Sequence, residues 1–127
     1  MSTIPDDLKY TRDHEWVRAA ADGTLTVGIT DFAQKELGEL VFVELPQVGQ
    51  QLASGDACAT VESVKAVSEV FAPADGKVVE TNASLADSPE LINDDPYGEG
   101  WLFRLKAGGS PPELLDAAAY RKLLEEE

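Results

Sequence analysis

ACATVESVKAVSEVF, residues 57–71, decides how this chain folds, because it contains neither Gly nor Pro and is longer than a typical strand. Val61, Val64 and Ser68 have helical spacing, and Ala, Glu and Lys favour a helix. The Val and Phe residues favour strands instead, and the middle of the segment is more polar than its ends. We therefore expect two strands joined by a tight turn around Val64-Lys65.

Strand and turn signals on both sides of this segment predict a mainly β fold. Leu25, Val27 and Ile29 alternate with Thr and Gly residues, which is the period of a half-buried strand. Asp22-Gly23 and Asp75-Gly76 each predict a hairpin turn. We expect further strands at residues 15–18, 40–43, 77–80 and 101–106.

Two short helices are predicted between these strands. Asp31 followed three residues later by Gln34 resembles a capping box, with a helix over residues 32–37 that ends at Gly38. Ser88 before Pro89 predicts the start of a second helix.

The chain is predicted to be a single domain, residues 1–127, with its core at about residues 8–106. A C-terminal helix is expected at about residues 111–124, because Leu115, Ala119 and Leu123 recur every four residues. Strands separated by turns suggest an antiparallel sandwich or barrel.

Composition excludes several classes of function. The chain has 24 acidic and 10 basic residues and a net charge of −14, which excludes non-specific binding to nucleic acid or to an anionic membrane. Its one Cys and one His provide no internal disulfide and no multi-histidine metal site. Cys58 could pair with His14 as nucleophile and base, but its apolar neighbours favour a core residue. MSTIPDDLKY does not resemble a signal peptide, so we expect a cytoplasmic location.

Lys65 is the candidate functional residue that this fold exposes. At the tip of a hairpin its amine is accessible to a modifying enzyme, and acylation would turn the side chain into a long arm at a fixed place. Group carriers such as biotin and lipoamide need such a display. The alternative is that Lys65 is an ordinary solvated lysine at a turn. The spacing of residues alone favours this alternative.

A series of motifs along the chain favours a modified Lys65 instead. The motifs are YTRDHEWV (10–17), GITDFAQ (28–34), LGE (37–39), VFVELP (41–46) with Gly49, VESVKAVS (61–68), PELIN (89–93) and PYGEGW (96–101), and they occur in the same order in one known family. They resemble the motifs of the glycine cleavage system H proteins. The resemblance covers about residues 8–106, and the acidic C-terminal helix also fits it.

The resemblance implies a barrel-sandwich hybrid of two antiparallel sheets and a carrier that is not itself an enzyme. Lipoic acid would be joined by an amide bond to Lys65. The arm would receive an aminomethyl group from glycine decarboxylase (P protein) and deliver it to an aminomethyltransferase (T protein). Dihydrolipoamide dehydrogenase (L protein) would reoxidise the arm, and a lipoate-attaching enzyme would install it.

The resemblance also suggests roles for four other residues. Glu62, three positions before the lysine, and Gly76, eleven positions after it, would support recognition by the lipoate-attaching enzyme. For Gly76 we also expect a positive φ in a turn. His14 and Glu15 would lie near the cleft that shelters the loaded arm, where a carboxylate can hold an amine. Some family members carry a second histidine in the helix after the GIT motif. If that histidine contributes to the cleft, either Glu36 replaces it here or the role is absent.

Four alternatives remain at this stage. A lipoyl domain of a 2-oxoacid dehydrogenase typically has Asp before the lysine, where this chain has Val64. A biotin carrier would have Met on both sides, where this chain has Val64 and Ala66. An H-like protein that mainly relays lipoyl groups to other enzymes fits the same motifs. The last alternative is a small acidic interaction module with no cofactor.

Overall fold

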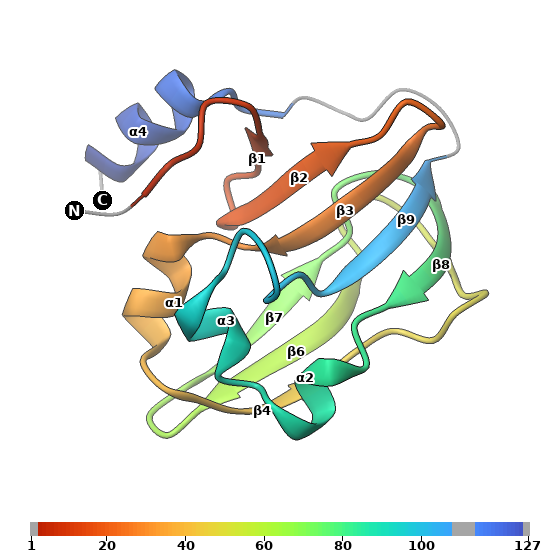
Figure 1. Ribbon diagram of the computed structural model, residues 1–127. Coiled ribbons are helices and arrows are strands. Elements are labelled where there is room, and N and C mark those ends of the chain that lie inside the picture. The colour runs from red at the N-terminus through yellow and green to blue at the C-terminus, as the bar shows by residue number, and fades with distance from the viewer. Residues whose placement is uncertain (1–2, 108–113, 126–127) are drawn as a thin grey trace.

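The computed structural model describes residues 3–107 and 114–125, which form two antiparallel sheets and four helices (Figure 1). The larger sheet has the strand order β1 (Lys9–Tyr10), β2 (Glu15–Ala19), β3 (Thr24–Ile29), β9 (Phe103–Ala107), β8 (Gly76–Thr81), β5 (Gln51–Leu52). The smaller sheet has the order β4 (Leu40–Glu44), β6 (Ala57–Ser63), β7 (Val67–Phe71). The helices are α1 (Asp31–Leu37), α2 (Ser84–Asp87), α3 (Leu91–Asp94) and α4 (Ala117–Glu125).

The central segment forms the expected hairpin. Strands β6 and β7 pair antiparallel, with Glu62 opposite Val67 and Val61 opposite Ser68, and the turn between them spans residues 64–66. The helical alternative for this segment is therefore wrong. Asp22-Gly23 forms the hairpin turn between β2 and β3, and Gly23 has a φ of 89°.

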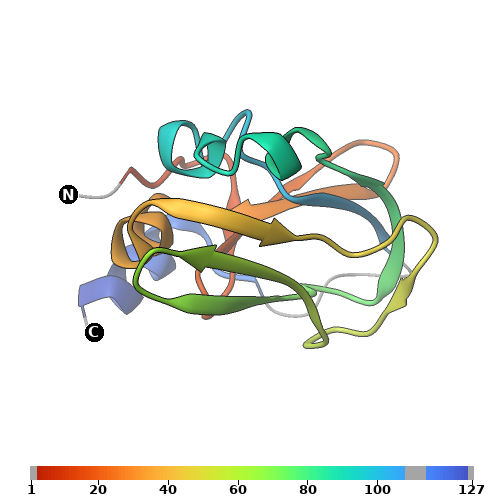
Figure 2. The same ribbon diagram turned by 90° about the horizontal axis from the view of Figure 1, so that it is seen from below.

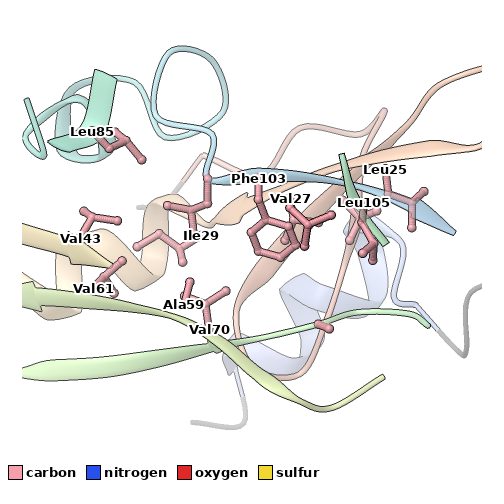
Figure 3. Packing of buried hydrophobic residues seen from close by; sticks show 14 of the residues in the cluster. Leu25, Val27, Ile29, Val43, Ala59, Val61, Val70, Leu85, Phe103 and Leu105 are labelled. Carbon is pink, nitrogen blue, oxygen red and sulfur yellow. The ribbon is translucent and has the colours of Figure 1, made fainter. Parts of the chain in front are cut away.

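The core lies between the two sheets (Figure 3). Val27, Ile29 and Phe103 of the larger sheet face Val61 and Val70 of the smaller one. These residues are the inward-facing members of alternating strands, so their apolar side chains leave water together on folding. This arrangement confirms the barrel-sandwich architecture.

A second apolar cluster attaches α4 to the larger sheet. The rings of Tyr10 and Tyr120 are stacked with centroids 4.7 Å apart, and both lie beside the fully buried Trp16. Figure 1 shows α4 next to the N-terminal segment and β1. Within the described residues, no helix is long and apolar enough to cross a membrane.

The C-terminal helix begins later than expected. Residues 111–113 of the predicted helix lie outside the described residues, and the helix itself starts at Ala117. Leu115 is not helical because its backbone exchanges two hydrogen bonds of 2.7 Å with Tyr10. The buried face of α4 consequently includes Tyr120, whereas Ala119 is exposed.

The caps of the two short helices also differ from the prediction. Thr30, not Asp31, is the N-cap of α1, and its hydroxyl accepts a hydrogen bond from the Ala33 N–H at 3.2 Å. Ser88 is the C-cap of α2, and α3 begins only at Leu91. Gly38 ends α1 with a φ of 85°, as expected for a glycine there.

The predicted hairpin turn at Asp75-Gly76 is wrong. Strand β7 belongs to the smaller sheet and β8 to the larger one, so the chain crosses between sheets at this point. Gly76 lies within β8 and does not have a positive φ. A side chain is excluded there for another reason: a Cβ atom would overlap the carbonyl oxygen of Lys106 on the paired strand β9.

Candidate functional site

Lys65 is exposed at the turn between β6 and β7, and the turn is held by a buried serine. The Ser63 hydroxyl accepts hydrogen bonds from the backbone N–H groups of Lys65, at 3.2 Å, and Ala66, at 3.0 Å. Ser63 is 5% exposed, so its hydroxyl is largely shielded from water. The turn is therefore a stiff base for an accessible amine.

The connection between α1 and β4 supports the same turn from the side. The Val64 N–H donates to the Glu39 carbonyl at 3.2 Å. Gly38 lies against the lysine side chain, since a Cβ atom there would be 3.3 Å from Lys65 Cε. Asn93 of α3 fixes this connection by donating to the Gly38 carbonyl at 2.9 Å and accepting from the Leu40 N–H at 2.9 Å.

Sequence analysis missed the role of Asn93. Its side chain also donates to Gln34 Oε1 at 2.9 Å, so one amide joins α3, α1 and the start of β4. Its neighbours in the chain are typical of a turn and give no sign of this position. A half-buried amide whose NH2 group donates twice and whose oxygen accepts once is the structural feature that identifies it.

The outer face of the smaller sheet, which begins next to the Lys65 turn, carries carboxylates and apolar side chains. Cross-strand pairing places Phe42, Glu62 and Val67 in one row, and Glu44, Thr60 and Glu69 in the next. Phe42 is 53% exposed and Val67 62%. We call these six residues the acidic face.

Glu62 and Gly76, the two predicted recognition residues, are not brought together. Glu62 lies on the acidic face, close in the chain to Lys65. Gly76 lies in the other sheet, and the β6–β7 turn and the start of β8 are at opposite ends of the molecule (Figures 1 and 2).

Glu15 is a carboxyl group that is almost completely buried. It is 1% exposed, and its carboxylate accepts from the Phe71 N–H at 2.7 Å and from the Thr11 hydroxyl at 3.0 Å. Burial raises the pKa of this carboxyl to about 7, although the two hydrogen bonds act in the opposite direction. Because Phe71 is in β7, the carboxylate links the two sheets.

Glu15 also lines a surface pocket of about 230 Å³ at the end of β7 remote from Lys65. Thr11, Arg12, Asp13 and Phe71 are among the other residues that line it. The pocket thus combines the carboxyl groups of Asp13 and Glu15 and the guanidinium of Arg12 with an apolar wall.

His14 does not line this pocket. Its φ is 66°, and its Nδ1 atom forms a 2.9 Å hydrogen bond with the Tyr120 hydroxyl, so the ring faces α4. The ring centroid lies 4.9 Å from that of Phe32 in α1. Phe32 is therefore the residue of this helix that lies beside His14, whereas Glu36 is exposed.

Cys58 has the properties of a structural residue. Its thiol donates to the Val70 carbonyl at 3.4 Å, and burial raises its pKa to about 12. A thiol that stays protonated at neutral pH is a poor nucleophile. No cluster of three or more potential metal-ligating side chains occurs among the described residues.

Comparison with known proteins shows which family this chain belongs to. A sequence model of the family described as "Glycine cleavage H-protein" matches residues 8–127. The chain belongs to this family. It is 54% identical over 129 residues to the glycine cleavage system H protein of Cronobacter sakazakii, with 100% of both chains covered. It is 56% identical over 129 residues to that of Halorhodospira halophila, with 100% of this chain and 99% of the relative covered.

The fold is shared with a solved member of the family. The crystal structure of a glycine cleavage system H protein from Mycobacterium marinum aligns with a TM-score of 0.91 at 45% identity. The alignment covers 96% of this chain and 99% of that one. This full-length similarity supports, for this chain, the role of a lipoyl-carrying shuttle of the glycine cleavage system. The alternative of a lipoyl domain of a 2-oxoacid dehydrogenase is not favoured.

Proposed function

We propose that Lys65 carries lipoic acid in amide linkage and that the protein acts, as a single carrier domain, as the shuttle of a glycine cleavage system. The observation that carries the proposal is the position of Lys65: an exposed amine on a turn that Ser63 and Glu39 hold in place. A stiff turn limits the volume that an attached arm can explore, which raises the chance of productive encounters.

The attached group supplies chemistry that the side chains of this protein lack, namely a sulfur that accepts an aminomethyl group and a dithiol that can be reoxidised. The protein's own contribution is display, orientation and shelter. We therefore propose that it is not itself catalytic. Within the described residues Cys58 has a raised pKa and His14 is engaged with Tyr120, so neither is placed as a nucleophile or base.

Glu15 is our proposed anchor for an amine at the end of the arm. Its carboxylate lines the pocket and is already held by Thr11 and Phe71, so little side-chain entropy would be lost on binding. A cationic amine beside it would lower its pKa and favour the carboxylate form. His14 would contribute to sheltering the arm only indirectly, because its ring contacts Tyr120 of α4 and does not line the pocket.

Four enzymes are the proposed partners: glycine decarboxylase, aminomethyltransferase, dihydrolipoamide dehydrogenase and a lipoate-attaching enzyme. The glycine cleavage H proteins to which this chain is similar are bacterial, and we propose a cytoplasmic location on that basis.

Glu62 and Gly76 remain our proposed residues for recognition by the lipoate-attaching enzyme. Glu62 would act by direct contact, and Gly76 by allowing the close approach of β8 and β9.

The proposal is tested by incubating the purified protein with lipoate, ATP and a lipoate–protein ligase and measuring its intact mass. We expect one lipoyl adduct on the wild type and on Lys77→Arg, an exposed lysine of β8 that serves as control. Lys65→Arg should remain unmodified and fold normally, since exposed substitutions usually change stability by less than about 0.5 kcal/mol. An unmodified wild type, or an equal adduct on Lys65→Arg, would refute the proposal.

A further inference from the structure

Strand β7 forms one edge of the smaller sheet, directly after Lys65. The sheet order is β4-β6-β7, so β7 has a hydrogen-bonded neighbour on one side only (Figure 2). Val67, Ser68 and Glu69 are all exposed. Edge strands carry unpaired N–H and C=O groups and readily accept an additional strand.

The backbone hydrogen bonds around β7 show which of its residues have outward-facing N–H and C=O groups. Ala66 accepts from the Ser63 N–H at 2.8 Å, and Ala72 bonds with Asp56 and Gly55, so even-numbered residues face β6. Phe71 faces away, because its N–H donates to Glu15. Backbone groups alternate along a strand, so Val67 and Glu69 also present their N–H and C=O groups away from β6.

This edge lacks the usual features that block strand addition. Strand β7 has the sequence Val-Ser-Glu-Val-Phe, with no Pro and no Lys. Glu15 occupies the Phe71 N–H but leaves the edge from Val67 to Glu69 uncovered within the described residues. An exposed edge without such features is a ready template for pairing.

The charge of the neighbouring side chains limits what can pair there. Glu69 continues the row of Glu44 and Thr60, and Val67 continues the row of Phe42 and Glu62. Lys65 is the only cation in residues 40–44 and 57–71. A side chain directly opposite Glu69 is therefore favoured if it is basic, and one opposite Val67 if it is apolar.

We propose that the edge of β7 binds an extended segment of the lipoate-attaching enzyme as an additional strand, with a basic residue opposite Glu69 and an apolar residue opposite Val67. The inference rests on the proposed lipoylation of Lys65. This enzyme is the partner that must dock closest to the turn, because an unmodified lysine side chain reaches only about 6 Å from its Cα, at about 1.2 Å per bond. A strand added at Val67 lies next to that amine.

The first test compares two substitutions of one residue. Glu69→Pro removes the outward N–H but no hydrogen bond to β6, and proline is tolerated on an edge strand when its N–H position faces solvent. Glu69→Gln removes the charge and keeps the N–H. We expect Glu69→Pro to lower the kcat/KM of lipoylation about tenfold or more, and Glu69→Gln by less than about threefold. Equal effects of the two substitutions would overturn the added strand.

The second test does not depend on whether the proline variant folds. Amide hydrogen exchange of the wild type is measured alone and with excess ligase, without lipoate or ATP. We expect Ser68 and Val70 to be protected in both samples, and Val67 and Glu69 to become protected only in the complex. Protection confined to other residues would overturn the proposal. If the wild type is not lipoylated at all, the proposed function fails; if it is lipoylated but these amides stay unprotected, only the docking inference fails.

Discussion

The buried carboxyl of Glu15 should make the stability of the protein depend on pH in a characteristic way. Its pKa is 4.5 as an isolated side chain and about 7 in the folded protein, chiefly because burial penalises the charged form. Between these values the folded protein holds a proton that the unfolded chain has released. The free energy of unfolding therefore falls as pH rises through this range, and Glu15 makes no further difference above it.

The size of the effect follows from the two pKa values. Between about pH 5 and pH 8 the contribution of Glu15 to the free energy of unfolding falls by about 2.5 kcal/mol. Glu15→Gln removes this contribution and keeps the contact between the sheets, because the amide oxygen can accept from the Phe71 N–H.

The assay is urea unfolding of the wild type and Glu15→Gln at a series of pH values. Subtracting the two curves cancels the contribution of the other acidic groups. We expect the difference to favour Glu15→Gln progressively with rising pH and to level off above about pH 7. Parallel curves, or a difference that favours the wild type as pH rises, would refute the account of Glu15.

Three further predictions concern residues of the scaffold. Gly76→Ala should lower the free energy of unfolding by about 1–3 kcal/mol, because the new Cβ overlaps the Lys106 carbonyl. A denaturant titration measures this change, and an unchanged midpoint would contradict the close approach of β8 and β9. Tyr120→Phe should cost about 1–2 kcal/mol, since the 2.7 Å hydrogen bond with the Thr30 hydroxyl is buried; a thermal melt equal to that of the wild type would show that the bond does not anchor α4. Cys58 should react with a thiol reagent at about pH 8 only after unfolding, because its pKa is raised; rapid reaction of the native protein would contradict its burial.

Local patterns predicted most of the longer strands and the lysine turn, for a physical reason, although they missed the short strands β1 and β5 and began β9 two residues early. The alternation at Leu25, Val27 and Ile29 depends only on which side of a strand meets the core. The polar residues around Lys65 mark where the chain leaves the core and turns. The family motifs then identified Lys65 as the candidate attachment site. Spacing alone did not separate it from an ordinary turn lysine.

The errors arise where distant parts of the chain decide the outcome. Asp75-Gly76 has the sequence of a hairpin turn, but its flanking strands find partners in different sheets. Leu115 fits a helical stripe, yet Tyr10 draws it into a β-bridge. The family motif suggested an amine-binding role for Glu15, and this role stays a prediction. Only the folded structure reveals that the carboxylate links β2 to β7.

The most direct test of the central claim is glycine–bicarbonate exchange reconstituted with purified glycine decarboxylase. The account predicts exchange with the lipoylated wild type and none with the unlipoylated protein or Lys65→Arg. Exchange of equal rate with Lys65→Arg, or no exchange with a fully lipoylated wild type under conditions where the H protein of Cronobacter sakazakii is active, would contradict it.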